Sequence, residues 1–283
     1  MRWPRRFVLG ASIILLIPTL LLVRKLDEIW DQYNVPAYIQ ASFGHSFQDQ
    51  PPPISGQVGD KIVIMAKLED EDTGWVNEYL PTWQRALYTV NPSSQPSPSS
   101  STDPILTTPL NKGHESMAYL TYIIDNYHSL PSTLAFLHSH RSGFLSAWHT
   151  DTPLHSNIDA LNSLQLAFVQ KMGYVNLRCN WNPGCEPAHR YNKHVTPEVW
   201  RSVFAGASMS QFSQKGNKSY TPEQVGSACC AQFAVSRERV LQRPKKDYEG
   251  FRRWVLETEK SDAMSGRVME FLWHVIFGMD AVQ

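Results

Sequence analysis

The hydrophobic pattern from residue 60 onward consists of short apolar runs that alternate with longer amphipathic stretches. The runs KIVIMAKL at residues 61–68 and STLAFLHSH at residues 132–140 are typical of strands buried on both faces. Between them, apolar residues recur at every third or fourth position, as expected for one face of a helix. That helical face contains Met117, Leu120, Ile123, Ile124 and Tyr127. Strands that alternate with helices predict an α/β domain with a mainly parallel sheet flanked by helices.

The same alternation continues in the C-terminal half of the chain. The stretch at residues 157–172 predicts one helix, ended by Gly173 and followed by a strand. Thr196 and Ser236 are expected to cap helices, because a hydroxyl before an amphipathic stretch can accept a bond from a free backbone N–H. The final two helices are predicted over residues 245–259 and 265–278.

Residues 7–23 form an apolar run without a charge, preceded by three arginines and followed by Arg24 and Lys25. Seventeen helical residues span roughly 26 Å, close to the thickness of a hydrocarbon core. We therefore predict a cytoplasmic tail at residues 1–6 and a transmembrane signal anchor at residues 7–23. The chain would be a single-pass protein of the ER, Golgi or another secretory-pathway membrane, with its C-terminal domain in the lumen. The alternative is a cleaved signal peptide.

Composition divides the remainder of the chain. Residues 24–59 contain three consecutive prolines and no hydrophobic period, which predicts a stem or linker. The globular domain is expected over residues 60–278. Within it, residues 91–110 include the run NPSSQPSPSSSTDP and predict a flexible insertion.

Charge and motifs exclude several classes of protein. Lys plus Arg and Asp plus Glu each number 26, so the net charge is zero and no basic surface for nucleic acid is expected. The sequence contains no nucleophile-elbow, P-loop, dinucleotide-glycine or H-E-x-x-H motif. This argues against the common esterases, P-loop enzymes, nicotinamide enzymes and zinc peptidases.

The four cysteines fit an oxidising compartment. Cys179 and Cys185 flank an Asn-Pro-Gly turn and are predicted to form a disulfide. Cys229 and Cys230 are adjacent, which disfavours a bond between them, and a four-cysteine zinc site is a weaker alternative. Asn217 begins the sequon Asn-Lys-Ser and is a candidate for glycosylation.

Four segments together resemble a fungal family of unknown function. They are NKGHESMAYLTYIIDNYHSLPSTLAFLHSH, NLRCNWNPGC, CCAQFAVSRERVLQRP and SGRVMEFLWHVIFG. The same segments are distantly similar to GT-A type glycosyltransferases, through the helix–strand unit that begins NKGHE and through QFAVSR…RP. The resemblance implies a GT-A or Rossmann-like fold over about residues 60–278. It also implies an enzyme that transfers a sugar from a nucleotide-sugar donor.

His138 and His140 are the first candidates for a site. Ligands of open α/β sheets bind beyond the carboxyl ends of the strands, and residues i and i+2 of a strand face the same side. In the glycosyltransferases that the chain resembles, this place holds a metal-binding Asp-x-Asp, whereas here it reads His-Ser-His. We predict that both imidazoles hold a divalent metal ion. The alternative is a metal-independent site in which protonated His140 or Arg141 meets the diphosphate.

Residues at other element ends are candidates for binding the donor. Asn111, Lys112 and Glu115 precede a predicted helix, whose N-terminus can hold a phosphate or a sugar hydroxyl. Capping by Asn111 is the structural alternative. Asp72 and Trp75 follow the first strand, and Trp75 is expected to stack on a base or sugar ring.

Arg178 and a set of acid–base groups complete the candidates. Arg178 lies at another strand end, where we expect it either to bind an anionic group of the substrate bidentately or to form a simple salt bridge. Glu270 and His274 are four residues apart on one predicted helix, and Glu270 is a candidate general base. Asp151 is a second candidate base, and His149 beside it a third ligand or acid–base partner.

The sequence therefore predicts a membrane-anchored glycosyltransferase-like enzyme. Its partners would be the membrane, a nucleotide-sugar donor and a small-molecule or glycan acceptor, with no nucleic acid. Two alternatives stay open: a non-transferase enzyme of fungal secondary metabolism, and a non-catalytic membrane-bound binding protein.

Overall fold

The computed structural model describes residues 5–44, 57–92, 106–185, 194–207 and 221–283, and of residues 5–15 only the backbone. A six-stranded sheet in the order β3-β2-β1-β4-β6-β5 forms its centre. The strands are β1 (Lys61–Lys67), β2 (Gln84–Thr89), β3 (Leu106–Thr107), β4 (Thr133–His138), β5 (Tyr174–Asn176) and β6 (Phe233–Ser236). Strands β3, β2, β1 and β4 run parallel, whereas β6 is antiparallel to both β4 and β5. The α/β class and the mainly parallel sheet are confirmed.

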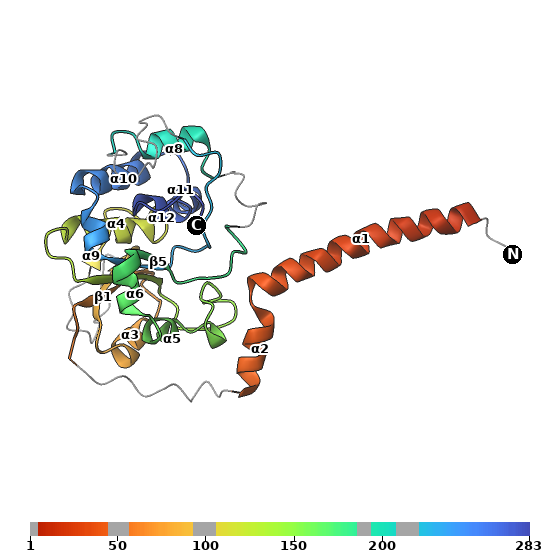
Figure 1. Cartoon of the computed structure of the whole chain (residues 1–283), viewed down its shortest axis with the longest axis horizontal. Coiled ribbons are helices and arrows are strands. Elements are labelled where there is room, and N and C mark those ends of the chain that lie inside the picture. Colours follow the sequence, from red (N-terminus) through yellow and green to blue (C-terminus); the bar gives the residue numbers. More distant parts are fainter. Residues whose placement is uncertain (1–4, 45–56, 93–105, 186–193, 208–220) are drawn as a thin grey trace.

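Helices cover both faces of the sheet (Figure 1). They are α1 (Arg5–Gln32), α2 (Val35–Gly44), α3 (Gly74–Tyr79), α4 (Ser116–Asp125), η1 (Pro153–His155), α5 (Asn157–Asn162), α6 (Leu166–Met172), α8 (Pro197–Val203), α9 (Arg237–Leu241), α10 (Lys245–Glu257), α11 (Asp262–Glu270) and α12 (Trp273–Ile276). Figure 1 shows α8, α10, α11 and α12 on one side of the sheet and α3 and α5 on the other.

The core consists of two apolar layers, one on each face of the sheet. Successive strand residues point to opposite faces, so Ile62 and Ile64 of β1 join the layer under α4 and α10, whereas Val63 and Met65 join the layer over α3 and α5. All four are at most 5% exposed. The uninterrupted apolar run that predicted this strand is therefore explained by burial on both faces.

Two predicted caps are confirmed, and two predicted helices are divided. The side chains of Thr196 and Ser236 accept hydrogen bonds from the backbone N–H groups of Val199 and Arg239. The helix expected over residues 157–172 is broken between α5 and α6, and the one over 265–278 is broken between α11 and α12. Both pieces of the second helix contribute to the same apolar layer, Val268 and Met269 from α11 and Trp273 and Ile276 from α12.

The N-terminal region is helical through most of the predicted stem. Helix α1 continues to Gln32 and points away from the domain, and α2 follows after a sharp bend and lies next to the domain (Figure 1). Over the residues whose side chains are described, no helix has both the length and the apolar character of a membrane span. Residues 7–15 of the predicted anchor lie outside that part of the chain, as do 45–56 of the stem, 93–105 of the insertion and Asn217.

Candidate functional site

A pocket of about 360 Å³ opens at the carboxyl ends of β1 and β4. In the sheet, β2 and β3 follow β1 on one side, whereas β4 is its neighbour on the other side. The order of the strands therefore reverses between β1 and β4. Such a switch point, at the carboxyl ends of parallel strands, is where open α/β sheets bind their ligands. We call this the switch-point pocket; it is lined by Ala66, Lys67, Leu68, Glu71, Val90, Asn111, His114, Glu115, His138, Ser139, His140 and Asp262.

His138 and His140 both line the switch-point pocket, as the strand-end argument predicted. The His138 Nε2 atom is buried and makes no hydrogen bond within the described part of the chain. Burial lowers the pKa of His138 to about 4, with a smaller contribution from neighbouring His140. His138 is therefore a neutral imidazole at neutral pH, suited to accept a hydrogen bond or to bind a metal ion rather than to act as a cation.

Two histidine–carboxylate pairs stand in the same pocket. The Nε2 atom of His140 lies 3.8 Å from the Oε1 atom of Glu71. The Nδ1 atom of His114 lies 3.7 Å from the Oδ2 atom of Asp262, whose other oxygen accepts the His114 backbone N–H at 2.9 Å. Imidazoles beside carboxylates are typical of acid–base sites. Neither His114, Asp262 nor Glu71 was among the predicted site residues.

Glu115 lies between these pairs and the core. It occupies the N-cap position of α4 without a side-chain cap bond, and it lines the pocket. The pKa of Glu115 is raised to about 8, chiefly by burial of its carboxyl and also by the nearby charges of Glu270 and Asp262, against the opposing effect of Arg267. A carboxyl group with this pKa can exchange a proton near neutral pH, which is the property of a general acid or base.

A buried polar network holds the histidine segment in place. Gln232, which is 1% exposed, accepts the His138 backbone N–H at 2.9 Å and donates to the Thr150 Oγ1 atom at 3.0 Å. Thr150 in turn donates to Asn157 at 2.6 Å, and Asn157 donates to the His140 carbonyl at 2.8 Å. Sequence reasoning missed these residues; the one signal was a glutamine immediately before the apolar run of β6.

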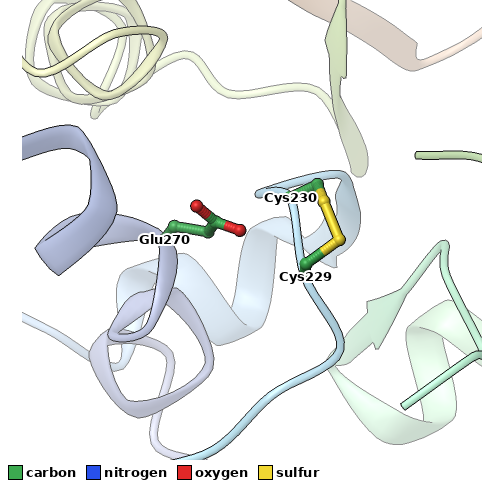
Figure 2. A group of neighbouring side chains, drawn as sticks. All are labelled: Cys229, Cys230 and Glu270. Carbon is green, nitrogen blue, oxygen red and sulfur yellow. A yellow bond between two sulfur atoms is a disulfide. The ribbon is translucent and has the colours of Figure 1, made fainter. Parts of the chain in front are cut away.

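Glu270 lies outside the residues that line the pocket, beside the bond between Cys229 and Cys230 (Figure 2). One of its oxygens pairs with Arg267, and burial raises the pKa of Glu270 against the influence of that arginine. The expected pairing with His274 is wrong: His274 is fully buried and its Nε2 atom bonds the Ala281 carbonyl at 3.0 Å. The break between α11 and α12 rotates His274 away from Glu270.

The predicted disulfide between Cys179 and Cys185 is wrong, since no disulfide joins these two residues in the structure. The turn between them directs the two side chains to different surroundings, because Cys179 is exposed whereas Cys185 is buried and donates to the Gln283 carbonyl at 2.9 Å. The disulfide instead joins adjacent Cys229 and Cys230, the pairing that we expected to be disfavoured.

Arg178 and Asp151 have structural roles in place of the expected ones. The fully buried Arg178 guanidinium donates to the carbonyls of Trp148, Gln32 and Asn182 at 2.6–2.9 Å. Asp151 Oδ2 accepts the backbone N–H groups of Cys179 and Asn180, and its Oδ1 atom lies 4.0 Å from Arg178. Neither side chain lines the pocket, because both hold loops together.

Lys112 and Asn111, both expected to bind the sugar donor, have different positions in the structure. Lys112 donates to the carbonyls of Leu256 and Thr258, at the end of α10. Asn111 lines the switch-point pocket but does not cap α4, which begins five residues later. Lys112 is therefore a structural residue, and Asn111 remains a candidate for contact with a ligand.

Asp72 and Trp75 lie at α3 and do not line the pocket. Asp72 accepts the Gly74 backbone N–H at 2.8 Å, in the turn that begins the helix. Trp75 is 4% exposed and its Nε1 atom donates to the Ser139 carbonyl at 2.9 Å. Trp75 cannot stack on a ligand from this position, but it fixes the residue between the two pocket histidines.

His149 lies beside His138 but does not line the switch-point pocket. Its ring lies 4.4 Å from the Trp148 ring and 4.6 Å from the His138 ring, centroid to centroid. The pKa of His149 is lowered to about 2, chiefly by burial and also by the charge that His138 would carry. The predicted partner Asp151 is occupied elsewhere, so His149 supports His138 sterically.

The donor set for a metal ion at His138 and His140 is incomplete among the described residues. Within that part of the chain, three converging Cys, His or carboxylate ligand atoms occur at Cys229, Cys230 and Glu270 alone. The two imidazoles would need ligand atoms from a substrate or solvent to complete a coordination sphere. Their role in metal binding stays a prediction.

A family model described as "Protein of unknown function (DUF3431)" matches residues 63–283 of the chain. This supports the resemblance to a family of unknown function, and it carries no information on a fungal source or on the similarity to glycosyltransferases. No curated protein and no solved structure gives a significant match.

Proposed function

The chain belongs to the family described as protein of unknown function (DUF3431), and from the geometry of its own pocket we propose that it is a GT-A-like enzyme. It would bind a nucleotide-sugar donor in the switch-point pocket and transfer the sugar to an acceptor hydroxyl. The observation that carries the proposal is the position of two pocket histidines and a buried carboxyl at the switch point of a mainly parallel sheet.

The proposed reaction is a displacement at the anomeric carbon. The acceptor oxygen forms a bond to that carbon, and the bond from the carbon to the phosphate oxygen breaks with its electron pair leaving on the nucleoside diphosphate. The acceptor proton passes to the carboxylate of Glu115, which lines the pocket. Glu115 thereby takes the role that the sequence suggested for Glu270 or Asp151. The His140 ring meets the diphosphate, whereas the neutral His138 would contact it through a divalent cation that the substrate carries.

A second candidate is an enzyme that uses the same acid–base groups on a substrate without a nucleotide. The charges of the pocket favour it: Glu71, Glu115 and Asp262 are acidic, and the single lysine, Lys67, donates to the carbonyls of Leu68 and Glu69. A diphosphate needs compensating positive charge, whereas an uncharged substrate does not.

The full chain, purified in detergent, distinguishes these candidates. Binding of a panel of nucleoside diphosphates and nucleotide sugars is measured by calorimetry, with and without Mg²⁺, Mn²⁺ or Zn²⁺, together with release of nucleoside diphosphate. We expect binding that His140→Ala weakens at least tenfold, and turnover that Glu115→Gln abolishes. His128→Gln, exposed and distant from the pocket lining, should behave as wild type. No binding to any donor would sink the transferase and leave the second candidate.

We propose also that residues 7–23 anchor the chain in a secretory-pathway membrane with its domain in the lumen. Support comes from the apolar side chains that α1 exposes, among them Leu20, Leu21 and Leu22, each more than half exposed. Expression in eukaryotic cells should give a protein that carbonate does not extract and whose mobility a glycosidase increases. Asn217→Gln should abolish the mobility change. A carbonate-extracted, unglycosylated protein would contradict the anchor and its orientation.

A further inference from the structure

The loop that leads into β6 places two adjacent, disulfide-bonded cysteines beside an acidic side chain (Figure 2). Cys229 and Cys230 are 3% and 6% exposed, and the Glu270 side chain is 11% exposed. Both sulfur atoms and a carboxylate oxygen lie within 4.8 Å of one another. The three side chains come from two segments of the chain, the loop before β6 and the last residue of α11, so the fold brings them together.

The two oxygens of Glu270 have different surroundings. The Oε2 atom binds Arg267, and the backbone N–H of Cys230 faces the carboxylate. The Oε1 atom is buried and makes no hydrogen bond of good geometry within the described part of the chain. Buried carboxylate oxygens are almost always bonded, because the loss of water costs free energy that a partner must offset. The Oε1 atom therefore has no strong partner among the described residues, and with the two sulfur atoms beside it the carboxylate is placed to bind a cation.

The backbone of the loop supports the same conclusion. Cys230 and Ala231 adopt φ angles of 99° and 52°, a region that residues other than glycine seldom occupy. Backbone conformations of this kind are unfavourable and cluster at ligand clamps and active sites. Two in succession, next to the Glu270 carboxylate, indicate a loop shaped for a purpose other than packing.

We propose that Cys229, Cys230 and Glu270 form a binding site for Zn²⁺ or a similar thiophilic divalent cation when the disulfide is reduced. A dithiol reductant gives two electrons and two protons to the sulfur–sulfur bond and becomes a disulfide itself. The cation then displaces the two thiol protons to water and binds two thiolates and the carboxylate, with water as fourth ligand. Bonds of about 2.3 Å to each sulfur place the thiolates roughly 3.7 Å apart in a tetrahedral site.

The site would be distinct from the switch-point pocket yet next to it. The Cys230 carbonyl lies against the His138 imidazole, whereas neither cysteine nor Glu270 lines the pocket. Reduction would thus add a cation close to His138, and oxidation would remove it. The proposal does not depend on the nature of the substrate.

Metal uptake by the full chain tests the site. The protein is prepared oxidised, and a second portion is reduced with a dithiol that is then removed without air. Both are mixed with Zn²⁺, passed through a desalting column and analysed for bound metal; Co²⁺ in place of Zn²⁺ reports thiolate ligands through its near-ultraviolet charge-transfer band. We expect about one equivalent in the reduced protein and almost none in the oxidised protein.

Variants locate the ligands. The double substitution Cys229→Ser and Cys230→Ser should abolish uptake and the cobalt–thiolate band, and Glu270→Gln should weaken binding at least tenfold. Cys179→Ser, which changes an exposed cysteine outside the group, is the matched control and should bind as wild type. Absence of uptake by the reduced wild-type protein overturns the site even if a variant fails to fold. Equal uptake by the double variant also overturns it, and equal affinity of Glu270→Gln removes the carboxylate from the site.

Discussion

The ring of His149 lies 4.6 Å from the ring of His138, centroid to centroid, directly behind the switch-point pocket. Burial lowers the pKa of both imidazoles, to about 4 for His138 and about 2 for His149. Protonation of both rings would place two like charges side by side in a poorly solvated position. The pair is therefore neutral throughout the physiological range, and the pocket presents ring nitrogens rather than positive charge.

His274 should make the fold sensitive to acid, because burial lowers its pKa to about 4. The unfolded chain binds a proton at this residue below about pH 6.5, whereas the native state binds one only near pH 4. The free energy of unfolding therefore falls as the pH falls from 6.5 to 4. His274→Gln keeps an N–H donor for the Ala281 carbonyl and removes the titration, so its loss of stability over this range should be smaller.

Thermal unfolding at pH 7.5 and pH 5 measures this difference. The exposed His128, changed to Gln, serves as the control and should retain the wild-type dependence on pH. A His274→Gln variant that loses as much stability as the wild-type protein between the two pH values would assign the acid sensitivity to other groups.

Glu115 should act in the opposite direction, because its native pKa of about 8 is higher than that of the unfolded chain, near 4.5. As the pH rises from 4.5 to 8, the unfolded state loses its proton first, and the native state becomes progressively less favoured. Glu115→Gln cannot ionise at this position and should therefore reduce the loss of stability with rising pH.

The midpoint of urea unfolding, recorded from pH 5 to pH 8.5, tests this prediction. Glu198→Gln, an exposed change on α8, should leave the wild-type curve, and a curve equally steep in Glu115→Gln would refute the raised pKa.

Gln232 should be necessary for the shape of the pocket. Replacement by Leu leaves the buried His138 N–H without an acceptor, which costs about 1–3 kcal/mol, and it removes the hydrogen bond that Gln232 donates to Thr150, while Thr150 keeps its bond to Asn157. We expect roughly 2–4 kcal/mol lower stability, together with weaker binding of any ligand of the switch-point pocket.

Gln170→Leu provides the comparison, since Gln170 also bonds two groups, Ser132 and Thr133, but at the opposite end of β4. It should lose stability without a selective loss of ligand binding. Chemical unfolding and calorimetric titration of the same samples separate the two effects. Equal ligand affinity in both variants would show that the network around Gln232 does not position the pocket.

Arg178→Lys should destabilise the protein despite the retained charge. A lysine ammonium cannot reproduce the planar set of donors that reaches Trp148, Gln32 and Asn182. Loss of these bonds in a buried position should cost about 3 kcal/mol. Differential scanning calorimetry should show a clear decrease in Tm, whereas Arg201→Lys, on the exposed surface of α8, should shift it by less than about 1 °C. An unchanged Tm in Arg178→Lys would contradict the structural role of this arginine.

The sequence predicted those features that depend on local pattern. The apolar runs at residues 61–68 and 132–140 contain the strands β1 and β4 because such runs require burial on both faces, and His138 and His140 line a pocket because β4 ends there. Thr196 and Ser236 cap helices as expected, since capping involves residues only three positions apart.

Features that depend on distant residues could not be read from the pattern. Arg178 resembles any arginine at a strand end until the carbonyl of Gln32, 146 residues away, is placed beside it. The network of Gln232, Thr150 and Asn157 joins three segments, and no local rule connects them. The pairing of Cys229 with Cys230 contradicted a local rule, which identifies this loop as one where folding imposes an uncommon conformation.

The clamp around Arg178 has a mechanical consequence for the whole molecule. The Arg178 guanidinium donates to the Gln32 carbonyl, in the last turn of α1, and to the Trp148 carbonyl, in the loop that precedes His149. These bonds fix the angle between α1 and the domain. A surface that binds the N-terminal end of α1 would therefore determine the direction in which the switch-point pocket opens. Any ligand of the switch-point pocket would then approach from one direction relative to α1, and a change in the bend at residues 32–35 would alter that direction without changing a residue of the pocket lining.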